Sequence, residues 1–397
     1  MSRNAFEEFR IQLRTLRWLG VLRFTIDFEK CSVRENAFEE QSAWLYTVVV
    51  VCLSCSVIFY SSYYPQHFAM GKHNSTGNCY ALINFRCCSM ATLLIYIQLY
   101  VRRYRFASLL ESMLGFNQIS GSRPGAGKAG LPYALHLSLF ALCMMNYAHG
   151  YWAAGVRWTT IPVYLFQYGF SYLILGQVIV LFVGFQRVLL STLKHYNQLI
   201  VNNLKSCKKS RGFYKNFRNY NEVIRLCYVE INYCFGLLLL PITGLILLIT
   251  PSGPFYLIST IFEGRFRQNW RFAFMSLTAA FWSLPWVILL VLAMGINDVQ
   301  KEANKTAKIL AKVPRTGTGL DRMIEKFLLK NLRQQPILTA YGFFALDKST
   351  LFKVKPAATK ISIRLLVFHF NIAVYGNLYV HGDFGSVQGN GELYEDG

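Results

Sequence analysis

Charged side chains are scarce in this sequence of 397 residues. Asp, Glu, Lys and Arg together make up 15% of it, whereas soluble domains carry about 25%. Acidic residues are the rarer kind, at 20 against 41 Lys and Arg residues. In their place the chain has 53% hydrophobic and 16% aromatic residues. A shortage of charge on this scale argues against an ordinary soluble domain and indicates a membrane protein.

Long apolar windows recur along the whole chain, and none of them contains Asp or Glu. A bilayer core about 30 Å thick needs roughly 20 predominantly apolar residues per helix. The first six windows form one transmembrane domain, residues 43–297, and a seventh helix follows. We therefore predict an all-α integral membrane protein with seven transmembrane helices, at residues 43–63, 79–101, 131–153, 161–185, 233–257, 272–296 and 356–376.

The Lys and Arg residues alternate between the two sides of these spans. Residues 1–42 and the connections after the second, fourth and sixth spans hold 33 of the 41. Because cytoplasmic loops retain positive charge, we predict a cytoplasmic N-terminus and an extracellular, acidic tail at residues 377–397. This distribution explains the net charge of +21 without a nucleic-acid partner. Residues 1–42 contain as many acidic as basic side chains and do not resemble a cleavable signal peptide.

Two short patterns fit the N-glycosylation acceptor motif. Asn74 begins Asn-Ser-Thr in the first predicted external loop, so we predict glycosylation there. Asn304 begins Asn-Lys-Thr in the most basic segment, which the charge distribution assigns to the cytoplasm. We interpret the second pattern as a chance match.

The long cytoplasmic connections carry apolar residues at helical spacing. In the connection 186–232 and in the anchor-like segment 298–355, these stripes predict helices that extend below the membrane. Two interpretations remain open: the stripes pack within one chain, or they join subunits. The stripe residues are Leu189, Leu193, Tyr196, Ile200, Leu204, Tyr220, Val223, Ile224, Cys227, Ile231, Leu320, Met323, Ile324, Phe327 and Leu328.

Signals for catalysis or for a bound cofactor are missing. His, Asp and Glu show no metal-ligand spacing, and the sequence offers no Ser-His-Asp arrangement. The ten cysteines are spread over spans and cytoplasmic loops, which indicates no disulfide framework. We therefore predict neither an enzyme nor a metal or cofactor site.

Aromatic residues crowd the outer halves of the third and fourth spans. Many belong to the interfacial belt, but Tyr147 and Tyr168 lie deeper, with His149 and Gln167 beside them. An aromatic cavity with a few polar groups suits a small organic ligand. Arg86 lies inside the second span, where it can reach the membrane surface, bond backbone or hydroxyl groups, or face water; we favour an aqueous vestibule. These five residues form the predicted ligand pocket.

Residues 338–371 resemble the most recognisable region of the insect gustatory receptors. That region has a Gly-aromatic-x-Leu-Asp stretch, a Leu-Phe pair and a final helix with Thr-Tyr, five apolar residues and Gln-Phe. Ser362 and Ile363 stand here in place of Thr-Tyr, and His369 stands in place of Gln, so the final helix departs from the pattern. The matching residues are Gly342, Phe343, Leu346, Asp347, Leu351, Phe352 and Phe370.

The resemblance implies a tetrameric, ligand-gated cation channel in the plasma membrane of sensory neurons. The ligand is a small-molecule tastant, cytoplasmic helices join identical or related subunits into a homo- or hetero-tetramer, and the last helix of each subunit lines one pore. Carried over by the motif, Ser362, Leu366 and His369 line that pore. The resemblance therefore predicts a receptor that mediates acceptance or avoidance of a tastant.

Helical geometry offers a competing view of the last helix. At about 100° per residue, Lys360 and Arg364 share one stripe, and His369 lies on the opposite side. If that stripe lined the pore, Arg364 would repel cations. We favour a pore lined by His369, with Lys360 and Arg364 directed at neighbouring helices.

Three alternatives remain. The altered last helix is compatible with a non-conducting co-receptor subunit. A G-protein-coupled receptor would have the opposite orientation in the membrane. A transporter is less favoured because the sequence shows neither internal repeats nor paired broken helices.

Overall fold

Helices account for almost all of the described chain. The computed structural model describes residues 10–22, 24–27, 30, 32–34, 37–68, 75–120, 130–153, 158, 161–205, 211–251, 257–258, 261, 284–294, 298–312 and 319–333. The predicted helix 356–376, the tail 377–397 and the first part of the span 272–296 lie outside these residues. The α-helices are α1 (Arg10–Trp18), α2 (Ala37–Tyr63), α3 (Ser75–Val101), α4 (Arg103–Ser120), α5 (Gly130–Ala153), α6 (Ile161–Lys205), α7 (Arg211–Arg225), α8 (Asn232–Ile249), α12 (Leu284–Met294), α13 (Asp298–Ala311) and α14 (Gly319–Arg333).

The other regular elements of the described residues are a short hairpin and two irregular turns. Strands β1 (Thr25–Asp27) and β2 (Ser32–Arg34) pair antiparallel between α1 and α2. A 3₁₀ turn, η2 (Pro65–Phe68), follows α2, and a π-helical turn, η3 (Leu226–Ile231), joins α7 to α8. The hairpin was not expected from the sequence and does not alter the helical class.

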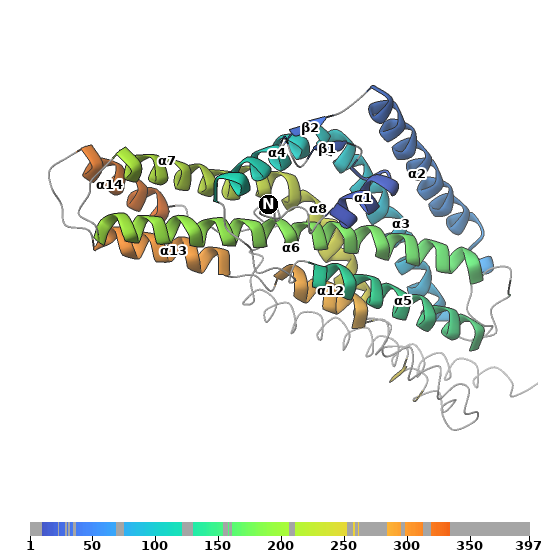
Figure 1. Ribbon diagram of the computed structural model, residues 1–397. Coiled ribbons are helices and arrows are strands. Elements are labelled where there is room, and N and C mark those ends of the chain that lie inside the picture. Colours follow the sequence, from blue (N-terminus) through green and yellow to red (C-terminus); the bar gives the residue numbers. More distant parts are fainter. Residues whose placement is uncertain are drawn as a thin grey trace, which may run out of the picture.

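Helix α6 is the central element (Figure 1). One half packs against α3, α4, α5 and α12, and the other half packs against α7 and α13. The predicted span 161–185 is its first half. The apolar stripe that begins at Leu189 continues as the same helix to Lys205 without a break.

Among the described residues, five helical segments are long and apolar enough to cross a membrane. They overlap the first five predicted spans, and α12 lies within the sixth. Helix α2 lies at the side of the bundle, with 17% of its most apolar window buried (Figure 1). The five segments are Phe38–Tyr63, Leu82–Val101, Leu131–Trp152, Ile161–Asn202 and Lys215–Ile249.

The apolar stripes of the long connections pack against one another within a single chain. Phe217 and Tyr220 of α7 are fully buried, and their ring centroids lie 5.5 and 5.8 Å from that of Phe327 in α14. Leu193 and Ile200 of α6 are also fully buried. Of the two interpretations, packing within one chain therefore accounts for these side chains.

Two arginines at the junction of α3 and α4 contact the start of α8. Arg102 donates a hydrogen bond to the carbonyl oxygen of Tyr233, and its guanidinium lies 4.2 Å from the centre of that ring. The guanidinium of Arg105 lies 4.0 Å from the same ring centre. Cation–π contacts of this kind hold charged groups beside apolar helices.

Candidate ligand site on helix α6

Four tyrosines meet in the halves of α5 and α6 nearest the connection between these two helices. Tyr147 and Tyr151 are one turn apart on α5, and Tyr164 and Tyr168 are one turn apart on α6. Residues four apart share a helix face, so each helix presents two rings to the other. Because the helices run antiparallel, Tyr147 meets Tyr168 and Tyr151 meets Tyr164.

The rings are stacked closely. The centroids of Tyr147 and Tyr168 are 4.9 Å apart with an interplanar angle of 8°, and those of Tyr151 and Tyr164 are 4.6 Å apart at 19°. Phe85 of α3 contacts Tyr164 and Tyr168 edge-on, at 5.4 and 5.9 Å. All five side chains are buried. We call Phe85, Tyr147, Tyr151, Tyr164 and Tyr168 the aromatic cluster.

Aromatic contacts continue along the same face of α6. Tyr172, one turn beyond Tyr168, contacts Trp286 of α12 edge-on at 4.8 Å and donates a 3.3 Å hydrogen bond to the carbonyl of Pro285. His136 of α5 stacks on Tyr172 at 5.4 Å. A Cβ atom at Gly176 would lie 1.9 Å from Cε1 of His136, so this crossing requires a glycine.

The structure brings some of the predicted pocket residues together and separates others. Tyr147 and Tyr168 are in direct contact. Gln167 is buried next to Tyr168 in the chain, whereas His149 contacts Trp152 edge-on at 6.0 Å and is only partly buried. A ligand role for each of these side chains stays a prediction.

Arg86 is held by the end of another helix. Its Nη2 donates a 2.6 Å hydrogen bond to the carbonyl oxygen of Ser61, and its Nε donates a 3.2 Å bond to the Ser61 hydroxyl. Ser61 lies in the last turn of α2, where carbonyl groups lack helical partners and carry a partial negative charge. Bonding to backbone and hydroxyl groups thus accounts for two donors of this cation, and the aqueous vestibule stays a prediction.

Three members of the aromatic cluster were not among the predicted pocket residues. The four-residue spacing of Tyr147 and Tyr151, repeated in Tyr164 and Tyr168, is a signal that the sequence does contain. Phe85 is different, because nothing in the sequence indicates which face of α3 meets α6. Its edge-on contacts become visible only in the packed structure.

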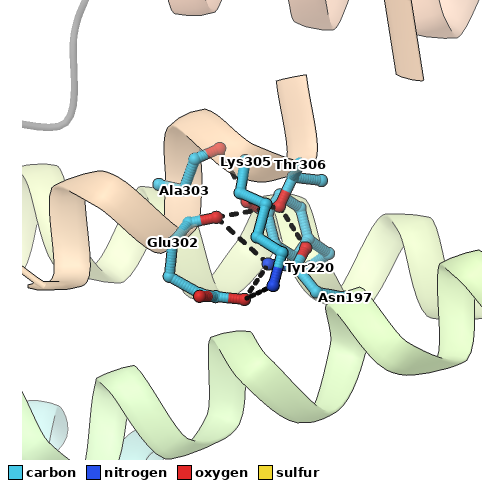
Figure 2. A network of polar contacts seen from close by, with 6 residues as sticks. All are labelled: Asn197, Tyr220, Glu302, Ala303, Lys305 and Thr306. Carbon is cyan, nitrogen blue, oxygen red and sulfur yellow. Dashed lines mark hydrogen bonds and ion pairs between the residues drawn. The ribbon is translucent and has the colours of Figure 1, made fainter. Parts of the chain in front are cut away.

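A buried polar network lies at the opposite end of α6 (Figure 2). Asn197 donates hydrogen bonds to the Glu302 carbonyl at 3.0 Å and to its carboxylate at 2.8 Å. Thr306 of α13 donates to the Asn197 side-chain oxygen and accepts from the Tyr220 hydroxyl at 2.6 Å. Lys305 pairs with Glu302 at 3.6 Å. The network joins α6, α7 and α13. Thr306, the last residue of the Asn304 acceptor motif, is buried in it, and we keep the interpretation of this motif as a chance match.

The remaining predicted site residues lie outside the described chain. These are the glycosylation site Asn74, the pore-lining residues Ser362, Leu366 and His369, the cations Lys360 and Arg364, and the motif residues Gly342, Phe343, Leu346, Asp347 and Phe370.

The fold and the apolar spans define a multi-pass helical membrane protein. Residues 9–369 match the 7tm chemosensory receptor family, and the chain belongs to this family. The predicted family resemblance and the all-α membrane fold are therefore confirmed.

Relatives of known name agree with this assignment. The chain is 71% identical to gustatory and pheromone receptor 39a, isoform D, of Drosophila melanogaster, over 93% of this chain and 97% of the relative. It is 40% identical to isoform A of the same receptor, over 91% of this chain and 95% of the relative. The olfactory receptor OR5 of Machilis hrabei, solved in complex with eugenol, superimposes with a TM-score of 0.66 at 11% identity, covering 92% of this chain and all of that one. This last similarity establishes the fold.

Proposed function

We propose that this protein is a gustatory receptor subunit that detects a small molecule and opens a cation channel in the plasma membrane of a sensory neuron. Family membership and the names of the relatives support the sensory role. The aromatic cluster is the observation that carries the proposal, because stacked rings of α5 and α6 and an edge-on ring of α3 meet on the central helix α6. Assembly as a homo- or hetero-tetramer is the arrangement that the family resemblance implies.

The chemistry of the cluster favours an uncharged ligand with aromatic or apolar character. Its five members carry no formal charge and offer four phenolic hydroxyl groups for orientation. Stacked or edge-on rings favour other flat rings and apolar groups. A pheromone is a second candidate ligand, since the relatives carry that word in their names.

Helix α6 offers a direct route from ligand to channel. A ligand that enters between Tyr147 and Tyr168 has to part the rings and so moves α5 relative to α6. Since α6 is continuous to Lys205, the movement reaches Asn197 and, through Glu302 and Thr306, helix α13. Helix α13 precedes the segment with the proposed pore residues Ser362, Leu366 and His369.

Whole-cell current in a heterologous cell tests this proposal. An agonist is first identified by screening flat, uncharged compounds; Tyr147→Phe and Tyr168→Phe then retain the rings but remove one hydroxyl each. A hydroxyl that bonds the ligand contributes about 0.5–1.5 kcal/mol, so we expect the half-maximal concentration to rise roughly 2- to 13-fold. Tyr63→Phe is the matched control, because Tyr63 is 74% exposed on α2. Agonist responses unchanged in both variants, and in Tyr168→Ala, would reject the site.

Two further measurements separate the alternatives. Current from this chain alone supports a conducting subunit, whereas surface expression with current only beside a related receptor indicates a non-conducting co-receptor.

His369→Ala is expected to change conductance, ion preference or block by acid, because histidine changes its charge near neutral pH.

An epitope tag at the C-terminus tests the proposed orientation. Antibody binding on intact cells agrees with a cytoplasmic N-terminus and seven spans. Binding only after permeabilisation would contradict this orientation and favour the topology of a G-protein-coupled receptor.

A further inference from the structure

Helix α1 is attached to the bundle by one face. Leu13 and Leu16 are buried there, and Gln12 donates a 3.2 Å hydrogen bond to the backbone carbonyl of Gln177 in the middle of α6. The Thr15 hydroxyl lies 2.9 Å from the hydroxyl of Tyr133, at the start of α5. The helix therefore has a fixed position at the end of the bundle where α2 and α5 begin.

A Schellman turn fixes the end of α1 against α2. Gly20 has a φ of 72°, Val21 N–H donates to the Leu16 carbonyl at 2.9 Å, and Gly20 N–H donates to the Arg17 carbonyl at 3.1 Å. A Cβ atom at Gly20 would lie 2.6 Å from the ring of Tyr46. The turn thus places the last residues of α1 directly beside the first membrane turns of α2.

The opposite face of α1 combines cations with exposed apolar groups. Arg10, Arg14 and Trp18 follow one another at four-residue spacing, and Ile11 lies beside them. Trp18 is 82% exposed and Ile11 is 64% exposed. A mixture of arginines and a tryptophan on one face is typical of helices that lie in the membrane interface.

Arg14, Arg17, Trp18 and Tyr46 line one open depression of about 410 Å³. Arg17 is partly neutralised, because it forms a 2.6 Å ion pair with Glu39. Within the described residues, Arg14 forms no ion pair. The depression therefore retains positive charge.

The apolar face of α2 leads away from this depression. Val49 and Leu53 follow Tyr46 at spacings of three and four residues, which places them on one face, and they are 47% and 53% exposed. The described bundle covers little of α2, and the span is apolar enough to face lipid. A cationic site at the end of an exposed apolar strip matches a ligand with an anionic head and a hydrocarbon tail.

We propose that this depression binds an anionic phospholipid, with the phosphate at Arg14 and Arg17, the headgroup beside Trp18 and Tyr46, and an acyl chain along Val49 and Leu53. With the N-terminus in the cytoplasm, as proposed above, the site faces the leaflet that carries anionic lipids. The lipid would hold α1 against the bundle next to Gln177 of α6.

Photocrosslinking of the purified full-length receptor tests the site. The receptor in detergent micelles is labelled with phosphatidylserine that carries a diazirine in its acyl chain, and the modified peptides are identified by mass spectrometry. We expect modification of α2 near Val49 and Leu53. Since each basic residue near a membrane surface contributes about 1 kcal/mol, Arg14→Gln should lower this labelling about fivefold. Arg34→Gln, an exposed arginine of the same N-terminal segment, is the charge-matched control.

Four outcomes would overturn the proposal. Equal labelling by the phosphatidylcholine analogue would remove the role of the anionic head, and suppression by millimolar inorganic phosphate would indicate a site for the free ion. Absence of lipid-derived modification on α2 would show that something other than this lipid covers the face. Equal labelling of Arg14→Gln and Arg34→Gln would also refute it. A detergent micelle does not separate a cytoplasmic from an extracellular face, so the labelling result does not depend on the membrane orientation that the epitope tag tests.

Discussion

Helices α2 and α6 are equally apolar but have opposite surroundings. Their most apolar windows have the same mean hydropathy, yet 83% of the α6 window is buried inside the molecule against 17% of the α2 window. In a bilayer both environments are apolar, so hydropathy does not distinguish a helix that contacts protein from one that contacts lipid.

The difference between the two helices lies in their small and polar residues. On α6, Gly169 and Gly176 let side chains of α5 approach the backbone, and Ser171 bonds Thr92 of α3 at 2.8 Å. The hydroxyl of Thr47 on α2 instead bonds the carbonyl of Ala43 in its own helix. Membrane helices associate through close packing and interhelical hydrogen bonds, so the close approach at Gly169 and Gly176 and the Ser171 bond contribute to the burial of α6.

The largest expected effect comes from Gly176→Ala. The new methyl group would lie 1.9 Å from the His136 ring, and overpacking of this degree costs more than about 3 kcal/mol. We expect little folded receptor in fluorescence-detected gel filtration. Gly244→Ala on α8, where a Cβ atom meets nothing within 4 Å, is the control and should elute normally. Recovery of the folded peak by adding His136→Ala would assign the defect to this contact, and a normal Gly176→Ala peak would contradict it.

A pair of leucines compares the two helices directly. Leu175 of α6 is fully buried, whereas Leu53 of α2 is 53% exposed. Leu175→Ala leaves a cavity and should lower stability by about 2–5 kcal/mol. Leu53→Ala should cost less than about 1 kcal/mol, because lipid chains fill the space. Thermal unfolding in a constant detergent measures both, and equal losses would show that α2 is also covered by protein.

A pair of threonine substitutions tests the polar network around Asn197 at the far end of α6: Thr306 of α13 belongs to the network, and Thr47 of α2 is the control. Thr306→Val removes the hydroxyl that joins Tyr220 to Asn197. The buried Tyr220 hydroxyl and Asn197 side-chain oxygen then lack this hydrogen bond, which should lower the free energy of unfolding by about 1–3 kcal/mol. Thr47→Val removes only a bond within α2 and should have a much smaller effect. If coupling passes through this network, the Thr306 variant should also shift the agonist response. A shift in stability alone would restrict the network to a structural role.

The smallest expected effect belongs to Ser171→Ala. The bond between the hydroxyls of Ser171 and Thr92 joins two helices, and interhelical bonds in membranes contribute about 0.6 kcal/mol on average. Ser62→Ala, which removes a bond to Ile58 within α2, is the control. A difference between these two variants in thermal unfolding would support the view that polar groups mark the buried helix; no difference would weaken it.

Much of the helical framework could be predicted from the sequence. Runs of apolar residues located the parts of α2, α3, α5, α6 and α8 that are long enough to span, and the stripe beginning at Leu189 predicted the extension of α6. The crowding of aromatic residues in the outer halves of the third and fourth spans also assigned Tyr147 and Tyr168 to one predicted pocket. These features depend on local sequence, which is why periodicity reveals them.

Other features depend on partners that are distant in the chain. Arg86 bonds a carbonyl group at the end of α2, and a backbone acceptor leaves no mark in the sequence. Phe85 joins the aromatic cluster because α3 packs on α6 with one particular face. The docking of α1 follows from contacts of Gln12 and Thr15 with helices more than a hundred residues away.

The π-helical turn η3 has a consequence for insertions and deletions. A π-helical turn holds one residue more than the α-helical path, so each residue of α8 is offset by about 100° from its place in a regular helix with the same number of residues. Before the turn, Phe217 faces α14; after it, Phe235 contacts Phe106 of α4 and Phe182 of α6. Deleting a single residue between 226 and 231 would let α7 and α8 join as a regular helix, and the later side chains of α8 would keep their present neighbours. The π-helical turn therefore absorbs one extra residue without changing the alignment of α8 with the rest of the bundle.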